Sequence, residues 1–268
     1  MDKDRPIGIF DSGIGGLTVA KAINDLLPNE SLIYFGDTAH LPYGDKSAES
    51  VRSYSLKIAA FLKEKGCKAI VIACNTASAR ATKSVSDLVG KDIPVVNVID
   101  PVAEYVGHKF KNKKIGVIAT KGTINSRVYP KRIHTFCPEV KVATKATPLL
   151  AAMIEEGFYN NNISKAVIHA YLDHPNLRKL DALILGCTHY PLIKKEVKDF
   201  YSSEVEVIDS SQFLARRLEI VLKENQLLSS KGSRSMEFYV SDFTESFKHC
   251  TRLFFGEEIS LKEARIWD

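Results

Sequence analysis

The sequence predicts an α/β fold made of two pseudo-duplicated, doubly wound parallel-sheet domains, with a candidate active site in the cleft between them. Strand-like and helix-like segments alternate along the 268 residues, which is typical of parallel sheets joined by right-handed helical crossovers. Residues 7–13 resemble residues 115–122, since each segment has an Ile-Gly-aliphatic strand followed by hydroxyl and glycine residues. Cys74 and Cys187 also stand in similar contexts, each at the end of an apolar run. A duplicated α/β unit accounts for both coincidences.

The expected strands are short, apolar and rich in β-branched residues, as buried parallel strands are. They are Pro6–Phe10, Ser31–Phe35, Ala69–Ala73, Val95–Val98, Lys114–Ala119, Val140–Thr144, Ala182–Leu185, Val205–Ile208 and Met236–Val240. Most of these strands are separated by segments with a helical period of apolar residues. The expected helices are Leu17–Leu27, Ser50–Lys65, Ser78–Val89, Leu149–Glu156, Ile163–Leu172, Leu192–Phe200 and Gln212–Glu224.

A domain boundary is expected near residue 100, where a proline follows a strand end at a helix start. The chain after about Asp209 is expected to hold a helix, a serine-rich loop, a strand and a final helix that complete the first domain. The predicted domains are therefore residues 1–99 plus 209–268, and residues 100–208.

Composition indicates an ordinary globular protein, with 45% hydrophobic and 26% charged residues. The 37 basic and 32 acidic residues leave a net charge of +5, and no aromatic residues interleave with the basic ones, so a nucleic-acid partner is not expected. No segment has the roughly 20 consecutive apolar residues that span a bilayer, so no membrane association is expected. The amino terminus lacks the apolar region of a signal peptide, and we expect a cytoplasmic protein.

Five cysteines are present, without a C-x-x-C pair. Zinc binding and thioredoxin-like chemistry are therefore not expected, and no metal site is predicted. Cys67, Cys137 and Cys250 are interpreted as packing or incidental residues.

Cys74 and Cys187 should each lie at the carboxyl end of a strand, just before a helix. Ligands of open α/β sheets bind at that edge, and the positive end of the following helix favours a thiolate. One such thiol suggests a nucleophile, whereas two on matching halves suggest an acid and a base. Cys187 also has His189 beside it.

Two loops are candidate walls of this site. Residues 11–18 (DSGIGGLT) carry glycines that let a ligand approach the backbone, and their N–H groups would suit a small carboxylate or amino acid. The spacing is neither a dinucleotide fingerprint nor a P-loop, and a tight turn with a capping serine is the alternative. Residues 36–44 form either a lid or wall of the site or a plain connection.

A phosphatase-like interpretation is also open, because Cys74 and Arg80 match the C-x5-R pattern. That pattern lacks a glycine in its loop and leaves Cys187 unexplained. Glu155, taken alone, is a charge at a helix end before a stop glycine.

Four motifs together resemble the cofactor-independent aspartate/glutamate racemase family, and within it the glutamate racemases. They are Phe10–Val19 (FDSGIGGLTV), Pro42–Gly44 (PYG), Ala73–Ala77 (ACNTA) and Gly186–Pro191 (GCTHYP). The resemblance implies a two-domain isomerase that interconverts L- and D-glutamate without a cofactor and supplies D-glutamate for peptidoglycan synthesis. Glutamate would be the small-molecule partner, and a homodimer is left open.

The resemblance also implies residue roles. Cys74 and Cys187 would be the two acid/base catalysts, with Asp11 supporting Cys74, and with His189 and Glu155 supporting Cys187. The residues that would line the substrate are Asp11, Ser12, Tyr43, Gly44, Asn75, Thr76, Thr188 and His189.

Other functions stay open at this point. Another small-acid racemase, such as an aspartate racemase, would carry the same motifs, and a related decarboxylase would need only one of the two cysteines. A two-domain protein that binds a dicarboxylate without catalysis is the alternative from a different class. Oligomeric state, regulation, net flux direction and any second protein-binding role are not written in the sequence.

Overall fold

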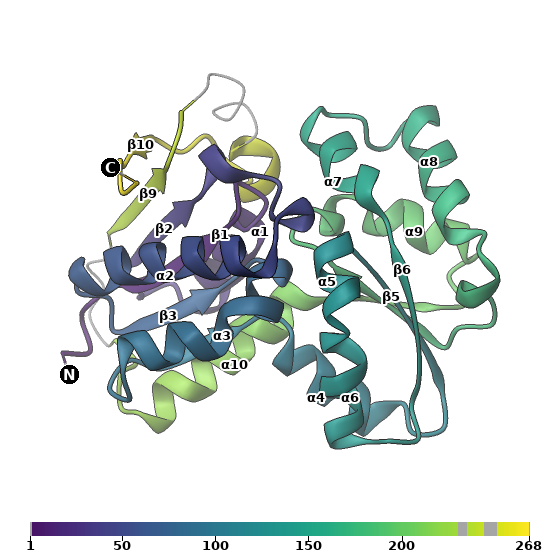
Figure 1. Cartoon of the computed structure of the whole chain (residues 1–268), viewed down its shortest axis with the longest axis horizontal. Coiled ribbons are helices and arrows are strands. Elements are labelled where there is room, and N and C mark those ends of the chain that lie inside the picture. Colours follow the sequence, from purple (N-terminus) through teal and green to yellow (C-terminus); the bar gives the residue numbers. More distant parts are fainter. Residues whose placement is uncertain (1, 230–234, 244–250, 268) are drawn as a thin grey trace.

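Two parallel β-sheets, placed side by side and flanked by helices, form the framework in the computed structural model (Figure 1). The structure describes residues 2–229, 235–243 and 251–267. The first sheet has the order β10 (Leu261–Glu263), β9 (Met236–Val240), β2 (Leu32–Gly36), β1 (Ile7–Asp11), β3 (Ala69–Ile72) and β4 (Val95–Asn97). The second has the order β6 (Lys141–Ala146), β5 (Lys114–Ala119), β7 (Ala182–Gly186) and β8 (Glu206–Asp209).

The strand orders of the two sheets correspond. In the first sheet β1 lies between β2 and β3, and in the second sheet β5 lies between β6 and β7. All of these pairs are parallel. The predicted α/β class with two parallel sheets is confirmed, and the repeated Ile-Gly segments form the equivalent strands β1 and β5. The domain boundaries given above stay a prediction.

Helices cover the sheets, and up to residue 229 they are α1 (Leu17–Leu26), α2 (Ala48–Glu64), α3 (Asn75–Val89), α4 (Asp100–Lys109), α5 (Lys121–Ser126), α6 (Val128–Phe136), α7 (Pro148–Glu155), α8 (Asn162–Leu172), α9 (Lys194–Phe200) and α10 (Ser210–Glu224). Their starts carry local signals: Ser47 Oγ accepts the Ser50 N–H at 3.1 Å at the start of α2, and Pro101 occupies the first turn of α4. All seven helices expected from the sequence are present, with ends shifted by at most a few residues. None of the described helices combines the length and apolar character that a bilayer crossing requires.

Three elements were not predicted. The segment between β5 and β6 forms α5 and α6, separated by Arg127 in the left-handed region (φ 55°). That break leaves helices too short to show a clear period. Strand β10 is three residues long and carries Lys262 and Glu263, so it has no apolar run.

In the carboxyl-terminal region, residues 251–255 are helical, whereas residues 230–234 of the serine-rich loop and residues 244–250, with Cys250, lie outside the described residues.

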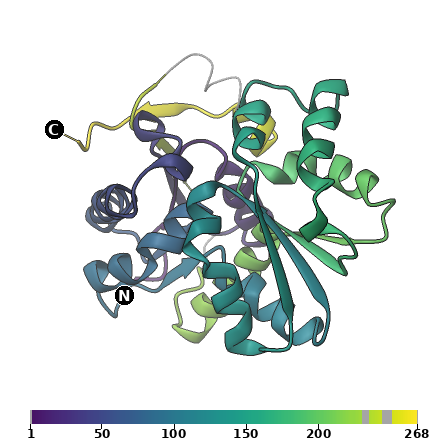
Figure 2. The same ribbon diagram turned by 45° about the vertical axis from the view of Figure 1, so that its right-hand side comes forward.

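The hydrophobic core is continuous between the two sheets. One buried cluster includes Ile9 of β1, Val117 of β5 and Leu214 of α10. Helix α10 packs against both α1 and α4, and Figure 2 shows this helix between the two halves. A second cluster, around Ile58 of α2 and Ile72 of β3, covers the other face of the first sheet. The two halves are therefore joined by packed side chains as well as by the chain.

Candidate active site

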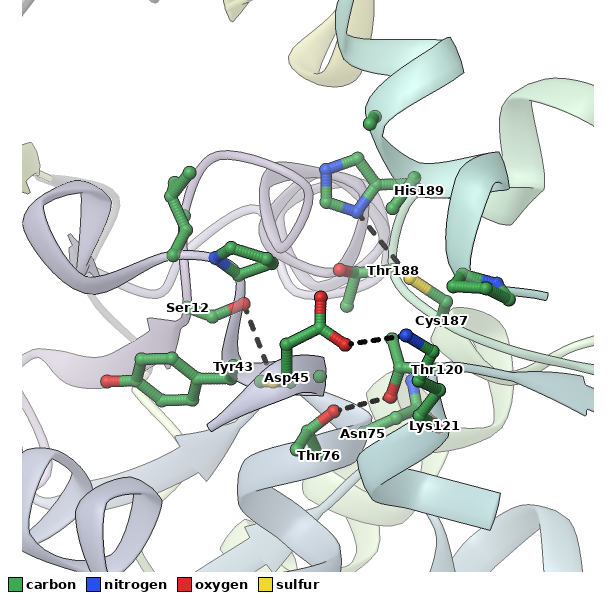
Figure 3. Close-up of a pocket in the computed structure, with 18 of the residues that line it drawn as sticks. Ser12, Tyr43, Asp45, Asn75, Thr76, Thr120, Lys121, Cys187, Thr188 and His189 are labelled. Atoms are coloured by element: carbon green, nitrogen blue, oxygen red, sulfur yellow. Dashed lines mark hydrogen bonds and ion pairs between the residues drawn. The ribbon is translucent and has the colours of Figure 1, made fainter. Parts of the chain in front are cut away.

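A cavity of about 480 Å³ lies where the carboxyl ends of the two sheets face each other (Figure 3). Cys74 and Cys187 both line it, with exposed fractions of 5% and 8%. Its other lining residues come from both halves: Ser12, Gly13, Leu41, Pro42, Tyr43, Gly44, Asp45, Asn75, Thr76, Thr120, Lys121, Pro148, Leu149, Ala151, Ala152, Glu155, Thr188 and His189. Two thiols from equivalent strands thus reach one enclosed space.

Cys74 lies between β3 and α3 and caps the first turn of that helix. Its Sγ accepts the Ala77 N–H at 3.4 Å and lies 3.6 Å from Ser12 Oγ. Burial raises the pKa of Cys74 to about 12, and the nearby Asp11 carboxylate adds to this, outweighing the Ala77 and Ser12 hydrogen bonds. The helix start acts in the predicted direction, since the Ala77 N–H lowers the pKa of Cys74, but burial and Asp11 outweigh it. The protonated thiol of Cys74 is therefore favoured over its thiolate.

Cys187 follows β7 and has a different environment. The next helical segment is a four-residue 3₁₀ helix, Tyr190–Ile193, so the expected α-helix start beside this thiol is absent. Instead, Cys187 Sγ lies 3.6 Å from His189 Nδ1, and His189 Nε2 lies 2.7 Å from Glu155 Oε1. Sulfur, imidazole and carboxylate therefore form a chain.

The contacts of His189 in this chain favour its protonated form. Burial alone would lower the pKa of His189, but its hydrogen bonds to Cys187 and Glu155 outweigh burial and raise that pKa well above its ordinary value. An imidazolium beside Cys187 Sγ stabilises negative charge on the sulfur. The two thiols thus sit in electrostatically different surroundings.

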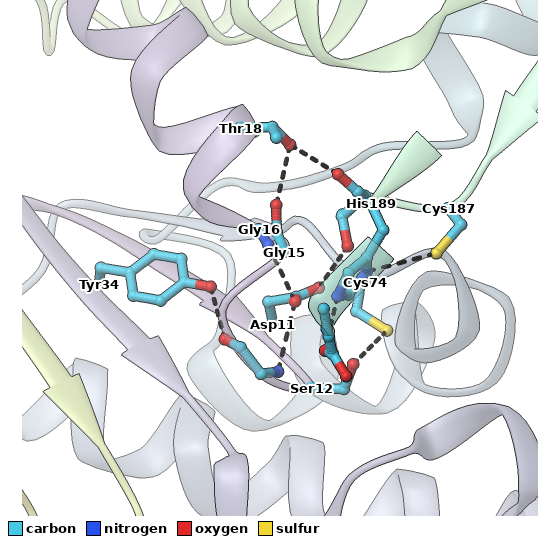
Figure 4. Close-up of polar contacts among 12 residues, drawn as sticks. Asp11, Ser12, Gly15, Gly16, Thr18, Tyr34, Cys74, Cys187 and His189 are labelled. Atoms are coloured by element: carbon cyan, nitrogen blue, oxygen red, sulfur yellow. Dashed lines mark hydrogen bonds and ion pairs between the residues drawn. The ribbon is translucent and has the colours of Figure 1, made fainter. Parts of the chain in front are cut away.

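Asp11 lies behind the cavity wall and is fully buried. Its carboxylate accepts the Gly16 N–H at 3.0 Å and the Gly13 N–H at 3.3 Å, and the Thr188 hydroxyl at 3.5 Å (Figure 4). Burial raises the pKa of Asp11. Among the described residues, its hydrogen bonds thus join the glycine loop to the second half and do not reach Cys74 Sγ.

The glycine loop serves the contact between the halves as well as the cavity. Ser12 and Gly13 line the cavity. A Cβ on Gly15 would lie 2.5 Å from His189 Nδ1, so glycine is needed for the approach of the imidazole. Thr18 Oγ1 donates to the Thr188 carbonyl at 3.0 Å. The loop that was predicted to bind a ligand therefore also packs against His189.

The loop after β2 is a wall of the cavity, as one of its two interpretations predicted. Asp37 is fully buried and accepts hydrogen bonds from Tyr43 Oη at 2.6 Å and Ser241 Oγ at 2.8 Å. His40 Nδ1 lies 2.9 Å from the same carboxylate. These contacts fix Tyr43, so that its ring faces the cavity while its hydroxyl points away toward Asp37.

Of the sequence-predicted site residues, ten line the cavity: Ser12, Tyr43, Gly44, Cys74, Asn75, Thr76, Glu155, Cys187, Thr188 and His189. Asp11 is the one that does not. Sequence reasoning missed Thr120 and Lys121, although they belong to the repeated segment that matches Asp11-Ser12-Gly13, and this repeat was the signal that could have found them. It also missed Asp45, for which the local pattern holds no signal.

The phosphatase-like alternative is not supported by the geometry. Arg80 lies on α3, and its guanidinium donates to the Gly122 carbonyl at 3.2 Å, so the arginine does not point at the Cys74 sulfur. Cys67 and Cys137 are buried thiols and do not line the cavity. Within residues 2–229, 235–243 and 251–267, no group of three or more His, Cys, Asp or Glu side chains is arranged to hold a metal ion.

Comparison with known proteins places this site in a family. A model of the Asp/Glu/Hydantoin racemase family matches residues 7–218. The glutamate racemase of Aquifex aeolicus is 43% identical over 256 residues, which are 96% of each chain, and that of Geobacter metallireducens is 42% identical over 258 residues, 95% of this chain and 94% of the relative. The crystal structure of the Francisella tularensis glutamate racemase in complex with D-glutamate superposes with a TM-score of 0.93, at 39% identity and with 99% of both chains covered. The chain therefore belongs to the Asp/Glu/Hydantoin racemase family and is an amino-acid racemase.

Proposed function

We propose that this chain interconverts L- and D-glutamate, with Cys74 and Cys187 acting on opposite faces of the substrate Cα. The observation that carries the proposal is that two cysteines from equivalent strands of two sheets line one cavity. Relatives at about 40% identity over nearly the whole chain are named glutamate racemases, which supports glutamate as the substrate.

The reaction needs one base and one acid. A thiolate takes the α-proton from one face, and the electron pair left on Cα is shared with the α-carboxylate. A thiol on the other face then gives its proton to Cα, which inverts the centre, and the first sulfur keeps the proton that it took. Each turnover therefore exchanges the protonation states of the two sulfurs, and the reverse reaction uses the opposite assignment.

The surroundings of the two sulfurs favour one assignment. Cys74 is held as a thiol by burial and Asp11, whereas the imidazolium of His189 lies beside Cys187. Cys187 is accordingly the base, and Cys74 the acid, in the direction that starts from this state.

Neutral donors surround the place where charge develops. Asn75 and Thr76 follow Cys74, Thr188 follows Cys187, and Ser12 lies beside the first sulfur. Hydroxyl, amide and backbone N–H donors stabilise the negative charge that moves onto the α-carboxylate, and they do so without an electron-accepting cofactor.

Asp11 acts in this scheme as a positioning residue. Through Thr188 and the backbone of the glycine loop it links the two halves, and its charge adds to the burial that raises the pKa of Cys74. The activity would supply D-glutamate for peptidoglycan synthesis, in the cytoplasmic setting that the sequence predicts; a homodimer remains compatible with it.

The test is the circular dichroism of L-glutamate and of D-glutamate with the purified, reduced protein and no added cofactor. The proposal predicts that the signal decays to zero from either enantiomer. If neither glutamate enantiomer changes while aspartate does, the substrate assignment is wrong. If glutamate binds and no amino acid racemises, the two-thiol mechanism is wrong as well.

A further inference from the structure

An ion pair between Asp45 and Lys121 lies in the cavity wall and has no part in the scheme above. Asp45 Oδ1 lies 3.4 Å from Lys121 Nζ (Figure 3). Asp45 ends the 3₁₀ helix Tyr43–Asp45 in the first half, and Lys121 begins α5 in the second half. The pair thus connects the two halves at the rim of the cavity.

This ion pair contributes little to holding the halves together. The two side chains are 56% and 55% exposed, and ion pairs with this exposure add little to stability. The close contact is made by other groups, since a Cβ on Gly44 would lie 2.7 Å from Thr120 Cβ, and Thr76 Oγ1 is bonded to Thr120 Oγ1 at 2.8 Å. Lys121 can therefore change its partner at low cost.

The charges of the wall indicate which partner Lys121 would take. Among the described residues that line the cavity, Lys121 and His189 carry positive charge. His189 is already bonded to Cys187 and Glu155. A second carboxylate entering this space therefore has one cation with an exchangeable partner.

Substrate geometry points the same way. Cα must lie between the two sulfurs, so the carboxylate attached to it lies among the neutral donors that follow the two cysteines, Asn75, Thr76 and Thr188. The side-chain carboxylate of an acidic amino acid extends away from that position. It then needs a separate cation.

We propose that Lys121 binds the side-chain carboxylate of the substrate, with Asp45 as its resting counter-ion that the substrate displaces. This inference rests on the proposed function and adds a residue that selects acidic over neutral amino acids. It assigns opposite effects to the two members of one ion pair: Lys121 attracts the substrate, and Asp45 competes with it.

The test compares the KM and kcat for glutamate in Lys121→Met and Asp45→Asn with the wild-type protein. Lys121→Met should raise KM about tenfold and leave kcat within about threefold, as expected for the loss of a charge-assisted hydrogen bond at an exposed site. Asp45→Asn should leave KM unchanged or lower it. Lys121→Arg keeps the charge and should recover most of the affinity.

Ionic strength gives an independent readout. The KM of the wild-type protein should rise with added salt, because a solvent-exposed charge pair is screened, and this dependence should flatten in Lys121→Met. Thermal melting of both variants should stay close to that of the wild-type protein, which shows that changes in KM do not come from unfolding.

Two results would overturn the proposal. If both variants raise KM to the same extent, the ion pair acts as a brace, and Lys121 is not a carboxylate receptor. If Lys121→Met has the wild-type KM, the side-chain carboxylate binds elsewhere. Both results require a wild-type protein that racemises glutamate, so they are distinct from failure of the proposed function, in which the wild-type protein itself is inactive.

Discussion

Cys74 and Cys187 occupy equivalent places in the two sheets, at the carboxyl ends of β3 and β7, but the groups around the two sulfurs differ. Cys74 caps a 15-residue α-helix and has Ser12 and the Asp11 carboxylate nearby. Cys187 precedes a short 3₁₀ helix and faces the charged His189, which Glu155 supports.

The comparison shows that the position of each cysteine thiol and its tendency to ionise depend on different parts of the structure. A repeated backbone brings each thiol to the same edge of its sheet, whereas a few neighbouring side chains make the electrostatic surroundings of the two sulfurs different. Two similar sulfurs can then serve opposite faces of one substrate. The following predictions test this division, beginning with the largest expected effect.

Replacing either cysteine sulfur should disable racemisation in both directions. Cys74→Ser and Cys187→Ser should each lower kcat/KM at least about 10³-fold, because a serine hydroxyl is a far weaker acid than a thiol and does not ionise near neutral pH to act as the base. Since the equilibrium constant of racemisation is one, the loss must be equal from L- and D-glutamate. Circular dichroism measures both directions, with Cys137→Ser as a buried control outside the cavity. Near-normal turnover in either active-site variant would exclude the two-thiol mechanism.

Removing the support of Cys187 should affect the two directions of proton transfer differently. His189→Gln should lower kcat about 10²-fold, because it removes the cation beside the Cys187 sulfur. Glu155→Gln should lower kcat about tenfold, because it removes only the carboxylate that orients His189. With substrates deuterated at Cα, the isotope effect in His189→Gln should grow for the one enantiomer whose proton Cys187 takes.

The exposed His108 provides the control, as His108→Gln should behave like the wild-type protein. Equal growth of the isotope effect for both enantiomers would contradict the assignment of His189 to proton transfer at Cys187 alone.

Alkylation should distinguish the two thiols in the resting protein. Cys187 should react with iodoacetamide at pH 7.5 at least about tenfold faster than Cys74, since the thiolate is the nucleophile and the pKa of Cys74 is raised to about 12. The similar exposure of the two residues, 8% and 5%, removes access as the explanation. Peptide mass spectrometry measures both rates, and His189→Gln should erase the preference. Faster labelling of Cys74 would reverse the proposed resting states.

The smallest expected effect is on stability at alkaline pH. The pKa of Cys74 is raised from 9.0 to about 12 in the folded protein, so the folded state binds this proton more tightly than the unfolded state. The resulting stabilisation is complete below about pH 9 and is lost as the pH rises through the folded value. The stability of the wild-type protein relative to Cys74→Ala should therefore fall between pH 8 and about pH 10.5 in urea unfolding. A constant difference would mean that the thiol is not held protonated.

Much of the fold could be predicted because its signals are local. Apolar β-branched runs such as Ala69–Ile72 and periodic helices such as α2 appear directly in the sequence. The α5–α6 segment could not be predicted in the same way, because the left-handed Arg127 divides it into two short helices.

The site residues that directly follow a strand could be predicted from the sequence. Both cysteines and their neighbours were found from the apolar runs before them and from the motifs that follow. The orientation of Asp11 toward Thr188, and the pairing of Asp45 with Lys121, depend on how two distant segments meet. No local pattern carries that information. The raised pKa of Cys74 was missed for a related reason, because burial in the assembled fold outweighs the helix start that the sequence shows.

The central claim, that two thiols act on opposite faces, is tested most directly by following racemisation in deuterated water. Early in the reaction of L-glutamate, proton NMR and chiral chromatography can separate the product from the remaining substrate. The account predicts that D-glutamate carries deuterium at Cα from the first turnovers while the remaining L-glutamate keeps its proton. Product that retains the original proton, or substrate that gains deuterium as fast as product forms, would show that a single group removes and returns the proton.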